Sequence, residues 1–344
     1  MATSTRQRSS TRSLYAGWGV FLVLAALPPF FFVDSEYFTV LTIAGIFAIT
    51  AVSLDLLLGY AGQLSLGQAA LFGVSAYVTA YLTVTKGWSP ELAALAAIAT
   101  TMLVALLTSP ILRLQGFYFA LATLSVTLIA ETIMRNWIDV TGGSSGFLGI
   151  GRLSFFGTEI TSDTAYYVVV WSVLAVVVLL GLQLGRSRFG RALLAVHEDE
   201  IAAQAMGVPV HSVKIRVWLL AAAFSGISGV LYAFYLRFIS PSQFGLLPTI
   251  MLIIMVVIGG TGTIYGAVIG SIFVRVLPVL FAGFEEYSPL VYGIAIIVFT
   301  VMFPGGIYGA VSDLIQRLRR GRSGATPFPK AADSAPATAG SRAA

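Results

Sequence analysis

The chain consists of long apolar runs separated by short stretches rich in charged residues, glycine or proline. Most runs approach the ~20 residues that a helix needs to cross the hydrocarbon core of a bilayer. Because lipid offers the backbone no hydrogen bonds, such runs are expected to be helical. The pattern predicts about ten membrane segments, at residues 14–33, 37–59, 66–84, 92–112, 117–134, 166–184, 215–236, 246–258, 264–280 and 290–303.

The expected fold class is therefore all-α, a polytopic bundle of transmembrane helices. The last three runs are shorter than a full crossing, so each is a candidate for a tilted, broken or re-entrant segment. We expect a cytoplasmic N-terminal tail at 1–13, a transmembrane domain at 14–312 and a cytoplasmic C-terminal tail at 313–344. The C-terminal tail is rich in Ala, Ser, Gly and Pro, which predicts that it is largely disordered.

Composition narrows the class of protein further. Hydrophobic residues make up 57% of the chain and charged residues 10%, with a mean hydropathy of +0.90. There is no Cys and there are two His, which argues against disulfides, thiolate catalysis and a metal site. The net charge of +5 does not indicate nucleic acid as a partner, because Lys and Arg in a membrane protein mainly set its orientation among the lipids. With the N-terminus inside, most of the 20 basic residues fall on the cytoplasmic side, as do both termini.

A hydrophilic interruption at 185–214 separates two apolar runs. Its basic residues are Arg186, Arg188 and Arg191, and its acidic residues are Glu198, Asp199 and Glu200. A short run of strong helix formers follows and ends at Gly207 and Pro209. Acids suit the positive end of a helix dipole, and glycine adopts the left-handed conformation that closes a helix. The pattern predicts a capped cytoplasmic helix with an apolar stripe of Ile201, Ala202, Ala205 and Met206.

The sequence from Gly59 to Gln68, GYAGQLSLGQ, places three glycines and several hydrogen-bonding side chains at membrane depth without a charge. One interpretation is a non-helical turn that lines a pathway, with Gln63, Ser65 and Gln68 as the side chains involved. The other is a plain cytoplasmic turn between two spans. A similar glycine cluster occurs at 259–262, and the repeat of glycine at 262, 266 and 270 predicts a flat helix face for close packing.

Two acids lie inside apolar runs, where ionisable side chains are candidates for function. Asp55 precedes the glycine-rich turn and is either a residue of the pathway or one that reaches the inner interface. Glu131 is either a residue of the pathway or the partner of Arg135, one helical turn further on. Arg275, in the ninth run, is expected to snorkel or pair structurally.

The longest outer loop begins with TGGSSG at 141–146. Its candidate residues are Gly142, Gly143 and Ser144. The loop is either a flexible connector or a shaped contact for something delivered from outside, and the pattern leaves both open.

The sequence does not support either of two motifs that would indicate an enzyme. The chain has no Walker A motif, so any ATP must be hydrolysed on another chain. The sequence GISG at 226–229 could hold a serine nucleophile, but both histidines, His197 and His211, lie in the cytoplasmic interruption, so Ser228 has no base in the membrane. Helix packing through small residues is the better account, and no catalytic site or cofactor is expected.

Several ordered segments of the chain resemble one family of membrane proteins. They are LDLLLGYAGQLSLGQ at 54–68, RLQGFYFA at 113–120, TGG at 141–143, GRALLAVHEDEIAA at 190–203 and MVVIGGTG at 255–262. These segments are similar to those of the permease subunits of branched-chain amino acid ABC importers, of the LivM-like type. The resemblance implies an all-helical permease that pairs with a second permease subunit, two ATPase subunits and an extracytoplasmic solute-binding protein in the bacterial inner membrane. It also implies that the loop residues Gly142, Gly143 and Ser144 are candidates for contact with the binding protein.

Under this resemblance the segment from Arg191 to Gly207 is similar to the E-A-A-x-x-x-G loop that docks in a cleft of the ATPase subunit. Counting back from Gly207 places Ile201, Ala202 and Ala203 at the E-A-A positions, with Glu200 one place early. The resemblance therefore implies coupling residues but not which acid matters. The candidates are Arg191, Glu198, Asp199, Glu200, Ala202, Ala203 and Gly207.

The function expected from the sequence is a non-enzymatic permease subunit of an ATP-driven importer for branched-chain amino acids or a similar small polar solute. Similar permeases are associated with urea, short amides and aromatic acids, so the solute stays open. The alternative is a stand-alone ion-coupled transporter in which Asp55 and Glu131 are the coupling acids. For either function the pathway candidates are Asp55, Gln63, Ser65, Gln68 and Glu131.

Overall fold

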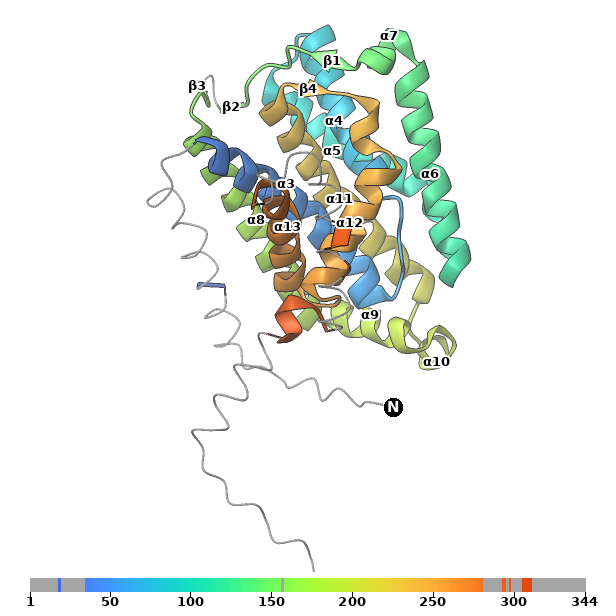
Figure 1. Ribbon diagram of the computed structural model, residues 1–344. Helices are drawn as coiled ribbons and strands as arrows, with labels where there is room; N and C mark the ends of the chain where they lie inside the picture. The colour runs from blue at the N-terminus through green and yellow to red at the C-terminus, as the bar shows by residue number, and fades with distance from the viewer. Residues whose placement is uncertain are drawn as a thin grey trace, which may run out of the picture.

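A computed structural model describes residues 18–19, 35–155, 158–280, 293–294, 297 and 305–310. Helices dominate these residues and lie side by side (Figure 1). The predicted tails at 1–13 and 313–344 lie outside the described residues, and so do most of the first and tenth predicted segments. The long helices are α3 (Ser35–Asp55), α4 (Gln68–Ala80), α5 (Pro90–Leu107), α6 (Gly116–Asn136), α8 (Asp163–Arg186), α11 (Val210–Leu236), α12 (Leu246–Gly259) and α13 (Ile264–Leu280).

Each of the eight predicted runs from 37–59 to 264–280 coincides with one of these helices. Six stretches among the described residues are long and apolar enough to cross a membrane, and the apolar part of α13 is a shorter helix, Ile264–Val279. Short π-helical turns extend α3 and α4, namely η1 (Leu56–Tyr60) and η2 (Tyr81–Thr85). The expectation of an all-helical polytopic membrane protein is confirmed.

The two ends of the bundle carry different short elements (Figure 1). At one end, here called the strand end, α7 (Ile138–Thr141) and η4 (Gly143–Ser145) lie near two small antiparallel pairs. The first pair joins β1 (Phe147–Leu148) to β4 (Phe238–Ile239), and the second joins β2 (Ser154–Phe155) to β3 (Thr158–Glu159). At the other end, here called the α10 end, lie α9 (Arg188–Glu198) and α10 (Glu200–Ala205). The remaining turns are η3 (Ser109–Arg113) and η5 (Pro241–Phe244).

The centre of the bundle is built on α3 and α11. The apolar windows of these two spans are 83% and 78% buried, whereas those of α5 and α6 are 22% and 28% buried. Helix α11 packs against α3, α4 and α5, and α3 also packs against α8 and α13. The most apolar faces of α5 and α6 are therefore left for lipid or for another subunit.

Small residues allow the central helices to approach closely. A side chain at Gly229 on α11 would collide with the backbone oxygen of Phe72 on α4, and one at Gly270 on α13 would collide with that of Met255 on α12. The hydroxyl of Ser228 donates to the carbonyl oxygen of Ile46 at 2.7 Å and accepts from Thr50 at 2.8 Å. The GISG sequence and the glycine repeat of α13 thus serve helix packing, as predicted.

Candidate functional site

The hydrophilic interruption folds into two helices at the α10 end rather than the single helix that the sequence predicts. The side chain of Ser187 caps α9, accepting a hydrogen bond from the backbone N–H of Gly190 at 3.0 Å. Leu193 and Val196 are buried and anchor α9 to the bundle, while Glu198 at its end is exposed. Arg191 is exposed too and donates to the carbonyl oxygen of Arg186 at 3.1 Å.

Helix α10 has the cap and the closing glycine that its sequence predicts. Asp199 is the N-cap, and its carboxylate accepts hydrogen bonds from the backbone N–H groups of Ile201 and Ala202 at 2.8 and 3.0 Å. Gly207 follows the helix with φ of 84°, in the left-handed region that favours glycine. The role of Asp199 is thus to begin the helix, which the order of the three acids alone did not reveal.

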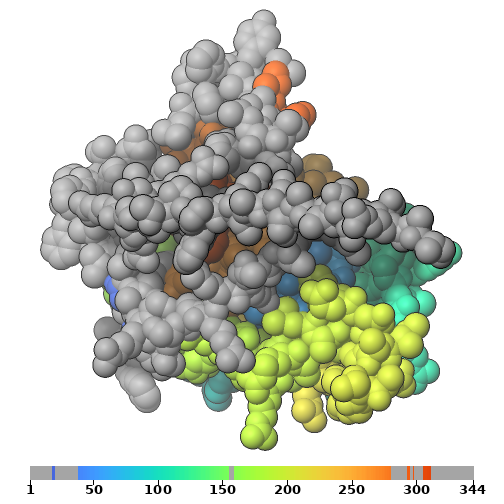
Figure 2. Space-filling model, turned by 90° about the horizontal axis from the view of Figure 1, so that it is seen from below, coloured from blue at the N-terminus to red at the C-terminus, as the bar shows by residue number. Residues whose placement is uncertain are grey.

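One face of α10 is open to the surroundings. Ile201 and Met206 are 81% and 85% exposed, whereas Ala203 is 5% exposed and faces the bundle. The predicted stripe, which also includes Ala202 and Ala205, lies on the exposed side. Figure 2, seen from the α10 end, shows the yellow-green surface of α9 and α10 facing the viewer. Two large apolar side chains are thus exposed, one on this short helix and one on the residue that follows it.

Glu200, at the start of α10, is bound within the chain. One carboxylate oxygen forms an ion pair with Nζ of Lys214 on α11, and the other accepts a hydrogen bond from Nε2 of Gln115 at 2.8 Å. Lys214 is 2% exposed, while Gln115, in the N-cap position of α6, is exposed. Neither partner was among the residues singled out from the sequence. A lone lysine at the start of an apolar run was the signal that could have indicated Lys214.

The glycine-rich sequence at 59–68 forms a non-helical segment at 62–67, between η1 and α4. Two threonines of α6 hold it: the backbone N–H of Leu66 donates to Thr123 at 3.0 Å, and its carbonyl accepts from Thr127 at 2.6 Å. Gln63 and Ser65 are buried, while Leu64 is 37% exposed. The exposed part of this segment is thus its backbone turn and Leu64, not the polar side chains predicted to line a pathway.

Gln68 lies at the centre of a buried polar cluster at the beginning of α4. Its Oε1 accepts hydrogen bonds from Ser225 of α11 at 2.6 Å and Ser53 of α3 at 3.1 Å. Its Nε2 has no hydrogen-bond partner among the described residues. The same holds for Nε2 and Oε1 of Gln63. The cluster ties three helices together inside the subunit.

Asp55 joins the two glycine clusters of the sequence. It is fully buried, and its Oδ1 accepts a hydrogen bond from the backbone N–H of Gly262 at 2.6 Å. Gly59 lies so close to Gly262 that any side chain there would collide with the backbone. The clusters at 59–62 and 259–262 are therefore in direct contact, and Asp55 stabilises the turn between α12 and α13.

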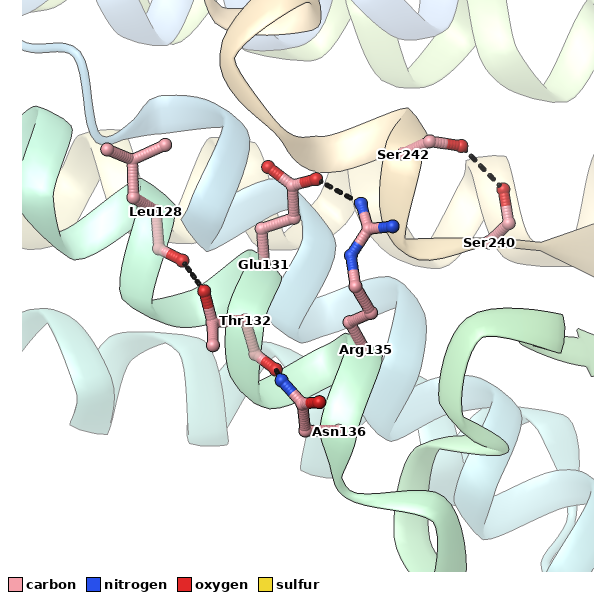
Figure 3. A network of polar contacts seen from close by, with 7 residues as sticks. All are labelled: Leu128, Glu131, Thr132, Arg135, Asn136, Ser240 and Ser242. Atoms are coloured by element: carbon pink, nitrogen blue, oxygen red, sulfur yellow. Dashed lines mark hydrogen bonds and ion pairs between the residues drawn. The ribbon is translucent and has the colours of Figure 1, made fainter.

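Glu131 and Arg135 form the pair that their spacing predicts (Figure 3). Nη2 of Arg135 lies 2.7 Å from Oε1 of Glu131, and the side chains are 50% and 20% exposed, respectively. The Glu131 carboxylate also lies against Gly245, the residue before α12. Carboxylate charge is favourable at the start of a helix, so Glu131 connects α6 to the beginning of α12. Arg275, by contrast, lies over the ring of Phe47, 3.7 Å from its centroid, inside the bundle.

The loop at 141–146 is shaped by local bonds. The hydroxyl of Thr141 donates to the carbonyl oxygen of Met134 at 2.8 Å and accepts from the backbone N–H of Gly143 at 3.3 Å. Gly142 and Gly143 have φ of 73° and 63°, which explains glycine at both positions. Ser144 is exposed at the strand end.

The candidate residues therefore form separate groups along the bundle. The coupling candidates lie at the α10 end, and the 62–67 segment meets α9 there, since Gly62 lies against His197. Asp55 lies at the end of α3 against Gly262, while Glu131 lies in the last turns of α6, which lead to the 141–146 loop. Among the described residues, no group of His, Asp and Glu could hold a metal ion. A cavity of about 470 Å³ between α4, α5 and α6 is lined by apolar side chains such as Tyr77, Ile133 and Trp137, and it offers a polar solute no compensation for lost hydration.

Comparison with known proteins identifies the family. Residues 37–300 match the family model described as the permease component of branched-chain amino acid transport systems. The chain belongs to this family. It is therefore the non-catalytic transmembrane subunit of an ABC importer. The match covers every membrane helix described above, so the whole bundle is the permease fold.

Curated relatives agree with the family model. The permease is 30% identical to the high-affinity branched-chain amino acid transport system permease protein LivM of Escherichia coli, over 83% of this chain and 73% of that protein. It is 24% identical to the corresponding LivH protein of Salmonella typhimurium, over 81% of this chain and 96% of that protein. A shorter stretch, 36% of this permease and 35% of the relative, is 28% identical to the L-arabinose transport system permease protein AraH of Escherichia coli. No solved structure matches the chain with comparable significance.

Proposed function

We propose that this permease forms half of the membrane pore of an ATP-driven importer that takes up branched-chain amino acids or a related small polar solute. Support comes from the family match over residues 37–300 and from relatives named for such amino acids. The LivM and LivH relatives resemble this chain over most of its length, which favours a pore built from two related permease chains. The membrane is the bacterial inner membrane, and both termini lie in the cytoplasm.

The α10 end is the site at which the ATPase subunit docks. Its exposed side chains Ile201 and Met206 form a small apolar surface on a helix capped at both ends by Asp199 and Gly207. A short, capped helix is rigid enough to transmit a movement of the ATPase subunit to the membrane helices. This exposed apolar face is the single observation that best supports coupling to an ATPase, because nothing in a stand-alone transporter requires it.

The solute passes beside the 62–67 segment and the exposed face of α6. Non-helical backbone at membrane depth is tolerated where protein or a water-lined cavity satisfies it, and here Thr123 and Thr127 of α6 bind the segment. A second permease subunit completes the pathway on this side, and the solute-binding protein docks at the strand end, where Ser144 is exposed.

The test is to express this permease with the ATPase, second permease and binding protein proposed as its partners, and to purify the complex through a tag on this chain. We expect the ATPase to co-purify and the reconstituted complex to take up L-leucine only when ATP is present. An ATPase variant that binds but does not hydrolyse ATP is the control. Uptake by this chain alone, driven by an ion gradient, would contradict the proposal.

The docking surface has its own test. Changing both Ile201→Asp and Met206→Asp places charge on the apolar face, which is expected to abolish co-purification of the ATPase while the chain still inserts in the membrane. The control is His211→Asp, which adds a charge at another exposed position of the same interruption. Unchanged co-purification of the double variant would show that the ATPase binds elsewhere.

A further inference from the structure

Glu200 contacts two membrane helices through one carboxylate. Its Oε1 pairs with Lys214, in the second turn of α11, and its Oε2 accepts from Gln115, in the N-cap position of α6. The Glu200 side chain is 26% exposed, but both oxygens are engaged within the chain. Glu200 is therefore poorly placed to bind an ATPase and well placed to fasten α10 to the bundle.

The pair with Lys214 fixes α10 firmly. The Lys214 side chain is 3% exposed, so its ammonium group has left water and depends on the Glu200 carboxylate for compensation. Charge-assisted hydrogen bonds of this kind are stronger and shorter than those between neutral groups. If α10 moved away from α11, the ammonium group of Lys214 would either become exposed to water or stay buried without its ion-pair partner.

The bond with Gln115 connects α10 to the part of the chain that holds the non-helical segment. From Gln115, α6 rises about 12 Å to Thr123 at about 1.5 Å per residue. Thr123 and Thr127 bind the backbone of Leu66. A continuous chain of contacts thus runs from the exposed face of α10 through Glu200, Gln115 and α6 to the 62–67 segment.

We propose that Glu200 is a positioning residue that transmits movement of α10 to α6 and α11, and is not a ligand of the ATPase. The proposal rests on the proposed function, since it requires an ATPase docked on α10. It assigns to Lys214 and Gln115 a role in coupling ATP hydrolysis to transport. The neighbouring acid Glu198 is exposed and has no bonding partner among the described residues, so it has no such role and serves as the matched control.

The test uses the full complex and a reporter that does not depend on the solute. The chain has no Cys, so Leu64→Cys provides one reactive thiol on the segment. The rate at which a maleimide labels this thiol is measured with and without ATP, in the otherwise unchanged chain and in Glu200→Gln, Gln115→Ala and Glu198→Gln. Co-purification of the ATPase is measured for each.

We expect all variants to retain the ATPase, and the ATP-dependent change in labelling rate to fall at least about fivefold in Glu200→Gln and Gln115→Ala but not in Glu198→Gln. Gln115→Ala removes an exposed side chain, so it remains informative if Glu200→Gln fails to fold. Exchanging the charges, with Glu200→Lys and Lys214→Glu, restores the response, because the Gln115 amide can present its oxygen to the new ammonium group.

Loss of ATPase co-purification in Glu200→Gln would show that Glu200 belongs to the docking surface and would overturn the inference. So would a normal ATP response in both Glu200→Gln and Gln115→Ala. These outcomes differ from failure of the proposed function, in which no ATPase co-purifies with the unchanged chain.

Discussion

At the residue scale, buried polar side chains act as ties between helices. Gln68 joins α4 to α3 and α11, Ser228 joins α11 to α3, and Asp55 joins the end of α3 to the turn before α13. In lipid such bonds replace the hydrophobic effect as a source of specific packing. Glycines complement them, since the helices touch where a side chain would not fit.

Replacing one of these glycines tests the packing directly. In Gly270→Ala, the added methyl group would meet the backbone oxygen of Met255 on α12, which we expect to destabilise the fold by about 1–3 kcal/mol. The thermal unfolding temperature of the purified chain in detergent should fall. Gly151→Ala is the control, because no atom of the described part of the chain lies within 4 Å of a side chain built there. Equal stability of both variants would contradict the close packing of α12 on α13.

At the element scale, the sequence predicts those helices whose signals lie in neighbouring residues. Apolar runs identify the helices because their period and length depend on neighbouring residues alone. The acids before α10 and the closing Gly207 are local signals too, and α10 was predicted from them, although the sequence did not show that Asp199 is the cap. Helix α9 was missed because its apolar run at 192–196 is short and is flanked by charged residues, so that the whole stretch looks like a loop in a linear sequence.

Contacts between distant segments could not be predicted in this way. Gln115 and Lys214 meet Glu200 only because three helices converge at the α10 end. The pathway candidates Gln63, Ser65 and Gln68 were chosen for polarity, and burial inside the bundle became visible only with the neighbouring helices in place. The two glycine clusters were recognised as similar, but their contact through Asp55 depends on the fold.

The 62–67 segment gives a prediction at this scale. Thr127→Val keeps the size of the side chain but removes the hydrogen bond to the carbonyl oxygen of Leu66, worth about 1 kcal/mol. The segment should then open about fivefold more often, so maleimide labelling of Leu64→Cys should accelerate by a similar factor. Thr132→Val is the control, because among the described residues the hydroxyl of Thr132 bonds only to Leu128 of its own helix. An unchanged labelling rate in Thr127→Val would mean that this bond does not hold the segment.

At the scale of the whole molecule, the bundle has distinct ends and a buried centre. Helices α3 and α11 form the buried centre, and α5 and α6 present apolar faces outward. Helices α9 and α10 occupy one end, and the short strands with the 141–146 loop occupy the other (Figure 1). An importer subunit needs two different ends, because ATP is hydrolysed on one side of the membrane and the solute arrives on the other.

The central claim is that α10 faces the cytoplasm and binds the ATPase. The most direct measurement is maleimide labelling of a single Met206→Cys thiol, compared between intact cells and inside-out vesicles, with Leu148→Cys at the strand end as the opposite marker. We expect Met206→Cys to react with an impermeant reagent only in inside-out vesicles, and more slowly once the ATPase is bound, while Leu148→Cys reacts in intact cells. Labelling of Met206→Cys from outside intact cells would contradict the account.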